Sequence, residues 1–366
     1  MLETVSIVVP TYKEKDNILT LVKRVNNSLS QYNYEIVIVD DDSGDGTAEL
    51  VSSLSVEFPV KIIIRKNKRG LASAVVDGIA SLNSEKVIVM DADLQHPPEV
   101  LPAIVNALEN NDFVMGSRYI KGGSPGQWKL SRKIISAVAN LLALPLAPRV
   151  KDRMSGFFGF KRAFVDTASL SPTGWKIGLE ILVRNKFKAV TEVPYTFEQR
   201  SSGISKLSRR IIWQYLQQLL DLYSYKYQIL NFMVVGGIGY VINLVLYYLL
   251  LLIPVFKTIR WSWLGEGDRN YLLPFVFSSL VAMASNYLLN RISTFKGWKE
   301  QKSGFARYMA MGIVTLFMDM ALLVLFVKYA GFPYVPAAAV AILIAFIARF
   351  IIARTWIWKK ATTRNN

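Results

Sequence analysis

Residues 229–253 form a run of 25 amino acids without a charged side chain. A helix of that length crosses the hydrocarbon core of a bilayer, which takes about 20 apolar residues. Three further apolar segments are long enough to span: 271–290, 308–327 and 331–352. We therefore expect an all-α transmembrane domain of four helices in two hairpins over residues 229–358, following a part of the chain with the composition of a soluble protein.

The distribution of basic residues predicts how these segments are oriented. Lys and Arg number five from residue 291 to 307 and five from 349 onward, against three in 254–270 and Lys328 alone in the last loop. By the positive-inside rule, the middle loop, both chain ends and the basic tail 359–366 face the cytoplasm. The start of the chain has no basic region followed by an apolar one, so we expect no cleaved signal peptide.

Short apolar segments alternate with helical patterns over the first third of the chain. Strand candidates lie at 5–10, 35–40, 60–65, 86–90 and 112–116. This alternation predicts a Rossmann-like α/β domain with a mainly parallel sheet, which we expect to occupy residues 1–206. Ligands of such sheets bind at the carboxyl ends of the strands. Neither G-x-G-x-x-G nor a P-loop follows the first strand. The sequence therefore lacks the phosphate-binding loops of the usual dinucleotide-binding proteins and ATPases.

A cluster of polar residues follows the fourth of these strands. Asp91, Asp93 and Gln95 alternate along the chain, so they can face the same way in extended backbone. Carboxylate and amide oxygens suit Mg²⁺ or Mn²⁺, and these ions keep open positions for substrate phosphates. The chain has no cysteine, and its single histidine, His96, stands before two prolines, where we interpret it as structural. We therefore predict a divalent cation on Asp91, Asp93 and Gln95.

Four motifs carry a family resemblance: VPTYKE at 9–14, DDDSGDGT at 40–47, DADLQHPP at 91–98 and GSRY at 116–119. Together with SGF at 155–157 and RSSGISKL at 200–207, they resemble family 2 glycosyltransferases, and among these the dolichol-phosphate mannose synthases. The resemblance implies a GT-A catalytic domain. It also implies inverting, metal-dependent transfer of mannose from GDP-mannose to dolichyl or another polyprenyl phosphate.

The same resemblance assigns roles to residues. It implies catalytic roles for Asp91, Asp93, Arg118 and Arg132. For the nucleotide sugar it implies contacts from Pro10, Tyr12, Glu14, Val39, Asp40, Asp41, Asp91, Ala92, Asp93, Arg200 and Lys206. For the acceptor phosphate it implies contacts from Arg118, Arg132, Arg200, Ser205 and Lys206. Glu180 is a further acid, which we interpret as orienting the substrate.

The chemistry of a lipid phosphate acceptor agrees with these residue types. A phosphate monoester has a second pKa of about 6, so it is an ionised nucleophile at neutral pH and needs no protein base. Two basic amphipathic stretches, 128–146 and 207–228, would hold such an acceptor at the membrane surface. The formal charge of +16 then suits an anionic membrane better than nucleic acid.

The membrane segments contain an internal similarity. Residues 232–236 resemble 308–312, and 291–296 resemble 354–359. The pattern is similar to the small GtrA-like membrane domains. Asp319 is the one acidic residue at membrane depth, and we expect it to pair with Asn243 or Asn286.

Three alternatives remain open at this point. Relatives that transfer glucose from UDP-glucose share these motifs. A processive polysaccharide synthase is a second possibility, but Q-x-x-R-W, which is usual in such enzymes, is absent from the sequence. The third alternative is a flippase or transporter of lipid-linked sugar, in which the soluble domain senses a nucleotide sugar. The sequence does not indicate an oligomeric state.

Overall fold

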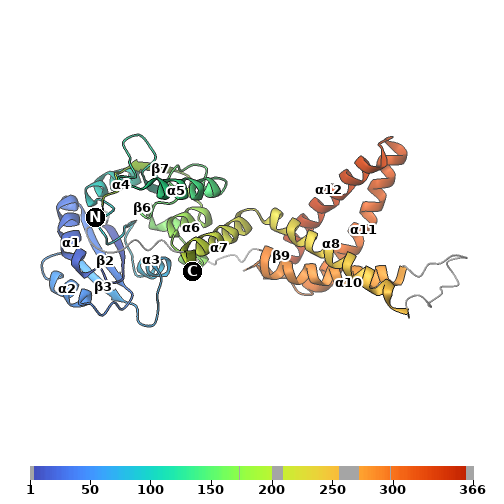
Figure 1. Cartoon of the computed structure of the whole chain (residues 1–366), viewed down its shortest axis with the longest axis horizontal. Helices are drawn as coiled ribbons and strands as arrows, with labels where there is room; N and C mark the ends of the chain where they lie inside the picture. Colours follow the sequence, from blue (N-terminus) through green and yellow to red (C-terminus); the bar gives the residue numbers. More distant parts are fainter. Residues whose placement is uncertain (1–3, 173, 200–208, 255–271, 297, 360–366) are drawn as a thin grey trace, which may run out of the picture. The chain divides into compact units, whose positions relative to one another are not determined.

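A computed structural model describes residues 4–359 apart from 173, 200–208, 255–271 and 297. The chain divides into two compact units, residues 1–226 and 227–366, which are described separately below (Figure 1). The sequence motifs that predict chemistry all fall in the first unit, and the long apolar segments all fall in the second.

The first unit is built on a sheet with the strand order β3-β2-β1-β4-β6-β5-β7. All neighbouring pairs are parallel except those of β6, which runs antiparallel to β4 and β5. The strands are β1 Thr4–Thr11, β2 Asn33–Asp40, β3 Val60–Ile64, β4 Lys86–Val89, β5 Phe113–Ser117, β6 Phe158–Lys161 and β7 Val190–Pro194. The predicted mainly parallel α/β sheet is therefore confirmed, with β6 and β7 as additions that the sequence patterns did not predict.

Helices cover both faces of this sheet. They are α1 Lys15–Leu29, α2 Thr47–Leu54, α3 Leu71–Ala80, α4 Leu101–Asn110, α5 Leu130–Ala143, α6 Ile177–Arg184 and α7 Arg209–Lys226, with short 3₁₀ turns η1 Pro98–Val100, η2 Arg162–Phe164 and η3 Thr167–Ser169. Helix α3 packs directly on β1 and β2, because a Cβ on Gly78 would lie 2.7 Å from Val8 Cγ1 and 3.0 Å from Val39 Cγ2.

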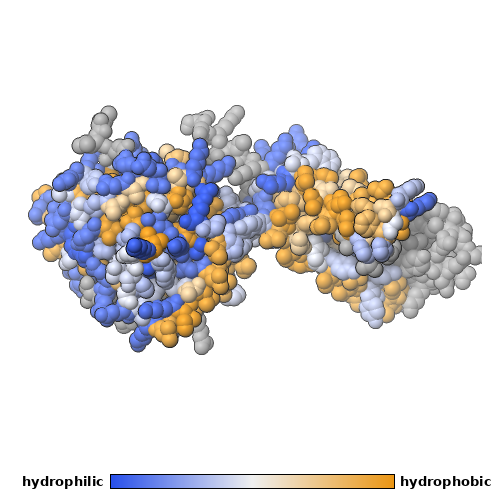
Figure 2. Space-filling view, turned by 90° about the horizontal axis from the view of Figure 1, so that it is seen from above, coloured by the Kyte–Doolittle hydropathy of each residue, from blue (hydrophilic) through white to orange (hydrophobic). Residues whose placement is uncertain are grey.

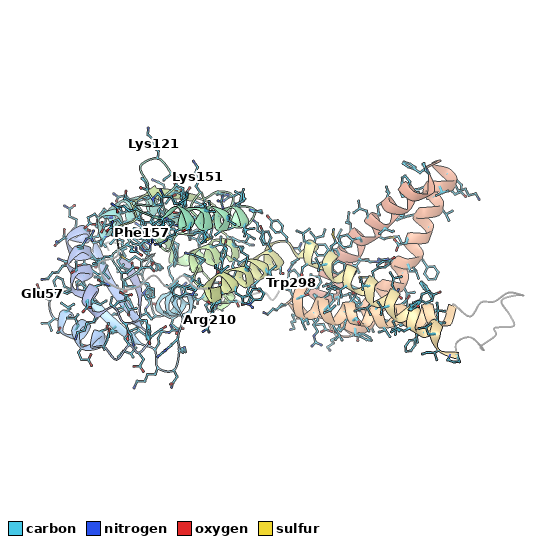
Figure 3. All side chains as sticks on the ribbon, viewed as in Figure 1. Glu57, Lys121, Lys151, Phe157, Arg210 and Trp298 are labelled. Carbon is cyan, nitrogen blue, oxygen red and sulfur yellow. The ribbon has the colours of Figure 1, made fainter. Side chains whose placement is uncertain are left out.

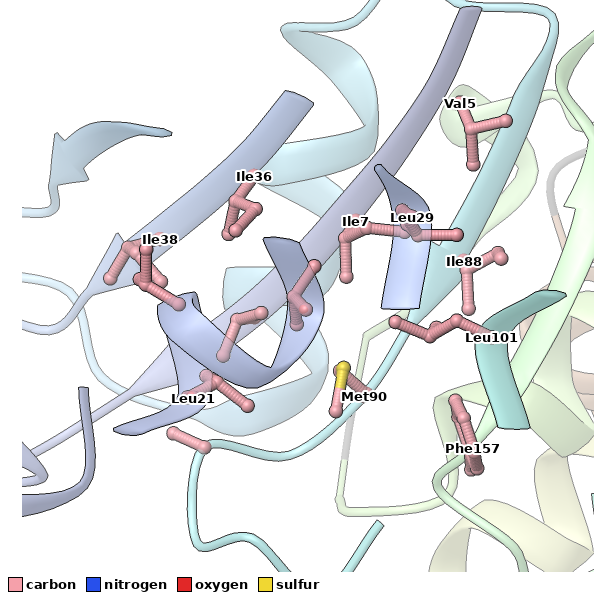
Figure 4. Packing of buried hydrophobic residues seen from close by; sticks show 14 of the residues in the cluster. Val5, Ile7, Leu21, Leu29, Ile36, Ile38, Ile88, Met90, Leu101 and Phe157 are labelled. Atoms are coloured by element: carbon pink, nitrogen blue, oxygen red, sulfur yellow. The ribbon is translucent and has the colours of Figure 1, made fainter. Parts of the chain in front are cut away.

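The core on the opposite face explains why the strands are continuous apolar runs. Ile7, Ile38 and Ile88 of adjacent strands are fully buried and pack with Leu21 of α1 and Leu101, the first residue of α4 (Figure 4). Strands covered on both faces leave no position for polar side chains except at their ends. The polar clusters therefore gather at the carboxyl ends of β1, β2, β4 and β5.

The second unit is helical. Its elements are α8 Gln228–Leu252, α10 Leu272–Leu289, α11 Gly304–Val324 and α12 Tyr334–Ile352, with π-helical extensions η5 Asn290–Thr294, η6 Leu325–Tyr329 and η7 Ala353–Ile357. Two helical stretches of the described residues, Gln228–Leu252 and Val340–Ile357, are long and apolar enough by length and composition to cross a membrane. In the face shown by Figure 2, broad apolar patches cover the helices of this unit.

An aromatic cluster joins the ends of these helices. Trp358 is buried and stacks on Phe295 with ring centroids 4.4 Å apart, and Tyr287 and Tyr308 pack around the same indole. Residues Lys299–Glu300 (β8) and Trp358–Lys359 (β9) pair as a two-stranded antiparallel sheet beside it. The loop between α10 and α11 is thereby bound to the segment that follows α12.

The expected partner of Asp319 is wrong. Its carboxylate binds the guanidinium of Arg349 on α12, and Arg349 Nε also donates to Thr315 Oγ1 at 2.8 Å. Asn243 instead accepts a hydrogen bond from Ser278 Oγ at 2.6 Å, between α8 and α10. The ion pair compensates both charges between the apolar helices α11 and α12, whereas an amide partner would leave the carboxylate charge uncompensated.

Candidate active site

The loop after β4 holds the carboxylates in a fixed shape. The backbone N–H of Asp91 donates to Nδ1 of His96 at 3.0 Å, and that of Gln95 donates to Asp93 Oδ1 at 3.2 Å. His96 is buried and stacks on Phe157 at 5.1 Å, and burial lowers the pKa of its imidazole. Since Nδ1 accepts a hydrogen bond, the proton of the neutral ring lies on Nε2. His96 therefore organises this loop, as its structural interpretation predicts.

The residues at this loop fit a divalent cation by their chemistry. A Cβ on Gly156 would lie 3.4 Å from Asp91 Oδ2, so the glycine keeps the space beside that carboxylate free of a side chain. The Gln95 side-chain N–H donates to the Glu198 carbonyl at 3.3 Å, which leaves the amide oxygen to act as a ligand. Within the described residues no group of three or more His, Cys, Asp or Glu could hold a metal. The remaining ligands would thus come from substrate and water, as is usual for Mg²⁺.

Asp40 and Asp41, at the carboxyl end of β2, hold neighbouring loops of the site in place. Asp40 accepts hydrogen bonds from Thr11 Oγ1 at 3.1 Å, Ser43 Oγ at 2.6 Å and Ser43 N at 2.8 Å. Asp41 accepts from Arg65 Nη1 at 2.6 Å and Gly70 N at 2.7 Å. Both acids are buried, and their hydrogen bonds hold the loops that carry Ser43 and Gly70. Of the two, only Asp41 is part of the cavity wall.

The other residues predicted for the nucleotide site also divide into those that line the cavity and those that do not. Pro10, Tyr12, Glu14, Asp91, Ala92 and Asp93 line the cavity. Val39 is fully buried in β2 against α3, so its side chain packs in the core. Arg69, which the sequence analysis did not single out, lies over the Tyr12 ring with its guanidinium carbon 4.9 Å from the centroid. A flat aromatic and cationic surface of this kind suits a nucleobase or a phosphate.

Two predicted arginines meet on one tryptophan. The guanidinium carbons of Arg118 and Arg132 lie 4.8 Å and 4.2 Å from the centroid of Trp128. Arg118 is also bound by buried Asp152, with Nε and Nη2 each donating at 2.7 Å. Trp128 and Asp152 were not predicted. Asp152 stands between Lys151 and Arg153, and such a charge run ordinarily indicates a solvated surface.

A half-buried lysine adds a further cation. Lys176 precedes α6, lines the cavity and donates from Nζ to the Met154 carbonyl at 2.7 Å. Burial lowers the pKa of Lys176 to about 8, and the neighbouring charge of Arg118 acts in the same direction. Glu180 lies in the next turn, but its carboxylate accepts from Ser171 N at 2.6 Å and from Arg184 Nε at 3.0 Å. These contacts give Glu180 a role in packing α6, contrary to the substrate role expected for it.

The far wall of the cavity is apolar. The cavity has a volume of about 860 Å³. This wall is formed by Ile134, Val138 and Leu142 of α5 and by Ile211 and Leu216 of α7. Two hydrogen bonds join these helices, from Tyr215 Oη to the Ala139 carbonyl and from Tyr223 Oη to the Leu142 carbonyl, each 2.7 Å long. Figure 3 labels Arg210 at the start of α7 and Phe157, whose ring stacks on His96.

One group of predicted site residues cannot be placed. Arg200, Ser205 and Lys206 lie outside the described residues. The last described residues before them, Glu198 and Gln199, are bound to the site side of the sheet: Glu198 N donates to the Gln95 carbonyl at 3.1 Å. Any contact of the three with a substrate stays a prediction.

Comparison with known proteins identifies the class. Residues 6–168 match the glycosyl transferase family 2 model, and residues 231–358 match the GtrA/DPMS transmembrane domain model. The fold, the carboxylate loop and these matches define a family 2 glycosyltransferase joined to a membrane domain. Over 365 residues the chain is 37% identical to the dolichol-phosphate mannosyltransferase of Pyrococcus furiosus, covering 97% of this chain and 99% of that protein. The chain belongs to the dolichol-phosphate mannosyltransferase family.

Two further similarities are more limited. The dolichol-phosphate mannosyltransferase of Mycosarcoma maydis is 42% identical over 235 residues, which cover 61% of this chain and 80% of that protein. Among solved structures, glucosyl-3-phosphoglycerate synthase from Mycobacterium tuberculosis with Mn²⁺, UDP and its product matches with a TM-score of 0.44 at 19% identity, covering 61% of this chain and 80% of that chain. A likeness of this size carries no argument about the site.

Proposed function

We propose that this protein transfers mannose from GDP-mannose to dolichyl or another polyprenyl phosphate, with inversion at the sugar C1. The observation that supports this most is the cavity that contains the Asp91 and Asp93 loop, the four cations Arg69, Arg118, Arg132 and Lys176, and the apolar walls of α5 and α7. A nucleotide sugar needs the carboxylate loop, the acceptor phosphate needs the cations, and an isoprenoid chain needs the apolar walls. Of the alternatives suggested by the sequence, transfer of glucose from UDP-glucose to the same acceptor would also use all three, so the test below separates the two sugars.

The transfer is a single displacement. An oxygen of the acceptor phosphate forms a bond to C1 of mannose while the bond from C1 to the β-phosphate oxygen of GDP breaks, and GDP departs with the electron pair. The acceptor is ionised near neutral pH, so no proton has to be removed by the protein. Arg118, Arg132 and Lys176 would hold its charge in line with C1 by charge-assisted hydrogen bonds.

The cation site completes this proposal. Asp91, Asp93 and Gln95 would hold Mg²⁺ or Mn²⁺ against the diphosphate of the donor. When bound, the ion supplies charge stabilisation for the departing diphosphate. The residues of this chain would fix the ion's position, because His96 and Glu198 each bind the loop.

The membrane arrangement is part of the same proposal. Helices α8, α10, α11 and α12 would cross the bilayer, with the catalytic unit and both chain ends on the cytoplasmic side. Helices α5 and α7 would lie in the membrane interface, since α5 exposes Leu130 and Leu141, which do not line the cavity. A phosphate on a long lipid then reaches the cavity while its chain remains in the membrane.

The direct test is transfer of radiolabel from GDP-mannose to dolichyl phosphate by protein purified in detergent. We expect a lipid product with Mg²⁺ or Mn²⁺ and none with a chelator. Asp91→Asn is the inactive control, and Asp42→Asn at an exposed position is the matched active one. Label transferred from UDP-glucose instead would assign the sugar to glucose. Movement of lipid-linked sugar across vesicles by Asp91→Asn would favour the transporter alternative.

A further inference from the structure

Arg24 on α1 binds two carboxylates from segments far apart in the sequence. Its Nε and Nη2 donate to Glu99 at 2.9 Å and 2.6 Å. Its Nη1 and Nη2 donate to Glu198 at 3.2 Å and 3.1 Å. Single exposed ion pairs contribute little to stability, but a bidentate arginine shared by two carboxylates belongs to the networks for which geometry matters.

Both carboxylates lie next to the predicted cation site. Glu99 is in the turn η1 directly after the loop that carries Asp91, Asp93 and Gln95. Glu198 binds Gln95 twice: its N–H donates to the Gln95 carbonyl at 3.1 Å, and its carbonyl accepts from the Gln95 side-chain amide at 3.3 Å. The second of these bonds fixes which atom of the amide remains for a cation.

We propose that Arg24 is a positioning residue for the divalent-cation site, acting through Glu198 on the amide of Gln95. Arg24 touches neither substrate nor cation. It holds the Glu198 backbone where its carbonyl takes the amide N–H, so the Gln95 oxygen is presented as a ligand. This inference rests on the proposed function, since it requires a cation on Asp91, Asp93 and Gln95.

Electrostatics gives Arg24 a second effect in the same direction. Glu99 and Glu198 converge on one guanidinium, and the hydrogen bonds from Arg24 lower the pKa of Glu99. Without the arginine, the two carboxylates would repel each other at that position. A displacement of the segment that carries Glu198 would break the bond to Gln95.

The test measures Mn²⁺ affinity of the full-length protein in detergent with GDP present, by calorimetry and by the spectrum of bound Mn²⁺. Loss of outer contacts to metal ligands weakens metal binding by about 10–100-fold, and Arg24→Ala acts one residue further away, so we expect about tenfold. Transfer at saturating Mn²⁺ should keep its kcat within about twofold, because no atom that contacts substrate changes.

Two more variants test the route through Glu198. Glu198→Gln should weaken Mn²⁺ binding as Arg24→Ala does, and the double variant should be no weaker than either single one, because residues acting through one path are not additive. Glu99→Gln should have the smaller effect. Lys61→Ala, which removes an ion pair with Glu35 at 2.7 Å on another part of the sheet, is the matched control without effect.

The outcomes separate this inference from the proposed function. If the wild type binds no Mn²⁺ and ignores chelator, the cation site itself fails, and the role of Arg24 fails with it. If the wild type binds Mn²⁺ and Arg24→Ala and Glu198→Gln bind it equally well, only the positioning role is overturned. A fall in thermal stability without a change in Mn²⁺ affinity would also overturn it.

Discussion

Asp152 binds Arg118 at three points: the two guanidinium nitrogens Nε and Nη2 at 2.7 Å each, and the Arg118 backbone N–H at 2.9 Å. The pair is buried. Asp152 binds the edge of the guanidinium, and the face of the guanidinium lies over Trp128. An arginine held on two sides has lost its side-chain freedom before any phosphate arrives, which lowers the entropic cost of binding the phosphate.

The Asp152→Asn variant tests this arrangement. Breaking one partner of a buried ion pair costs about 3–5 kcal/mol because the other charge stays buried. We expect a loss of that size in unfolding free energy, together with a higher KM for dolichyl phosphate and little change in KM for GDP-mannose. Denaturant unfolding of the detergent-solubilised protein and steady-state kinetics measure both. A loss below about 1 kcal/mol would show that Arg118 relaxes into solvent.

The cation prediction is tested at Asp93. Asp93→Asn should abolish Mn²⁺ binding and reduce transfer by more than about a hundredfold, which exceeds the effect of losing an outer contact. The thermal midpoint should stay near that of the wild type, because asparagine has almost the same size and shape as the aspartate that it replaces. Mn²⁺ titration and a thermal scan suffice. Full transfer in the presence of a chelator contradicts the prediction.

Lys176 predicts a pH dependence of stability. Its pKa falls from 10.5 to about 8 on folding, so between these values the unfolded state binds more protons and stability rises with pH. Below pH 8 the burial of this charge costs roughly 3 kcal/mol, at 1.36 kcal/mol for each tenfold change in proton affinity.

The Lys176→Met variant should therefore be more stable than the wild type at pH 7, with the difference shrinking from pH 8 to 10.5. It should also bind dolichyl phosphate more weakly, because one cation is lost. Unfolding curves at several pH values measure the first effect and KM the second. An unchanged difference across that pH range would contradict the assigned pKa.

The exposed face of α5 predicts a requirement for long lipid acceptors. Leu141 is 66% exposed, and burying a leucine contributes about 1.5–3 kcal/mol. Leu141→Asp should weaken use of dolichyl phosphate in vesicles by about tenfold or more, and leave a short, water-soluble prenyl phosphate unaffected. Val56→Asp is the control, since Val56 is 91% exposed between α2 and β3. Equal effects on both acceptors would place Leu141 outside the membrane contact.

The membrane unit gives a test by charge pairing. Asp319→Leu leaves Arg349 without its carboxylate, and an unpaired charge at membrane depth costs about 2.5–3.5 kcal/mol. We expect a lower thermal midpoint for the single variant and recovery in Asp319→Leu/Arg349→Leu. If the double variant is as unstable as the single one, the pair contributes through packing and not through charge.

The sequence predicted the sheet where its strands are unbroken apolar runs and failed where they are not. Strands β1 and β2 contain such runs because both of their faces are covered. Strand β7, Val190–Pro194, is only half-buried and carries Glu192, so nothing in its pattern distinguishes it from a loop. Strand β6 has four residues and depends on β4 and β5 for its pairing, which no local pattern records.

The site was likewise predictable only in part: residues at strand ends were predicted, and residues that act through distant partners were not. Asp91, Asp93 and Arg118 stand at strand ends, where sequence and topology together imply a ligand. Asp152 and Lys176 act through partners elsewhere in the chain; Asp152, for example, meets Arg118 across 34 residues. The partner of Asp319 is Arg349, a charged residue 30 positions later on α12, and no pattern within either apolar segment records which polar residues of two helices face each other.

The pairing of β8 with β9 also sets an order of events during synthesis. Strand β8, Lys299–Glu300, has no partner until Trp358 and Lys359 have left the ribosome. Helices α8, α10, α11 and α12 all precede that segment in the chain, so the pairing and the aromatic cluster can form only after all four have been made. A chain cut short before Trp358 would therefore contain the four helices but lack both β9 and the indole around which Phe295, Tyr287 and Tyr308 pack.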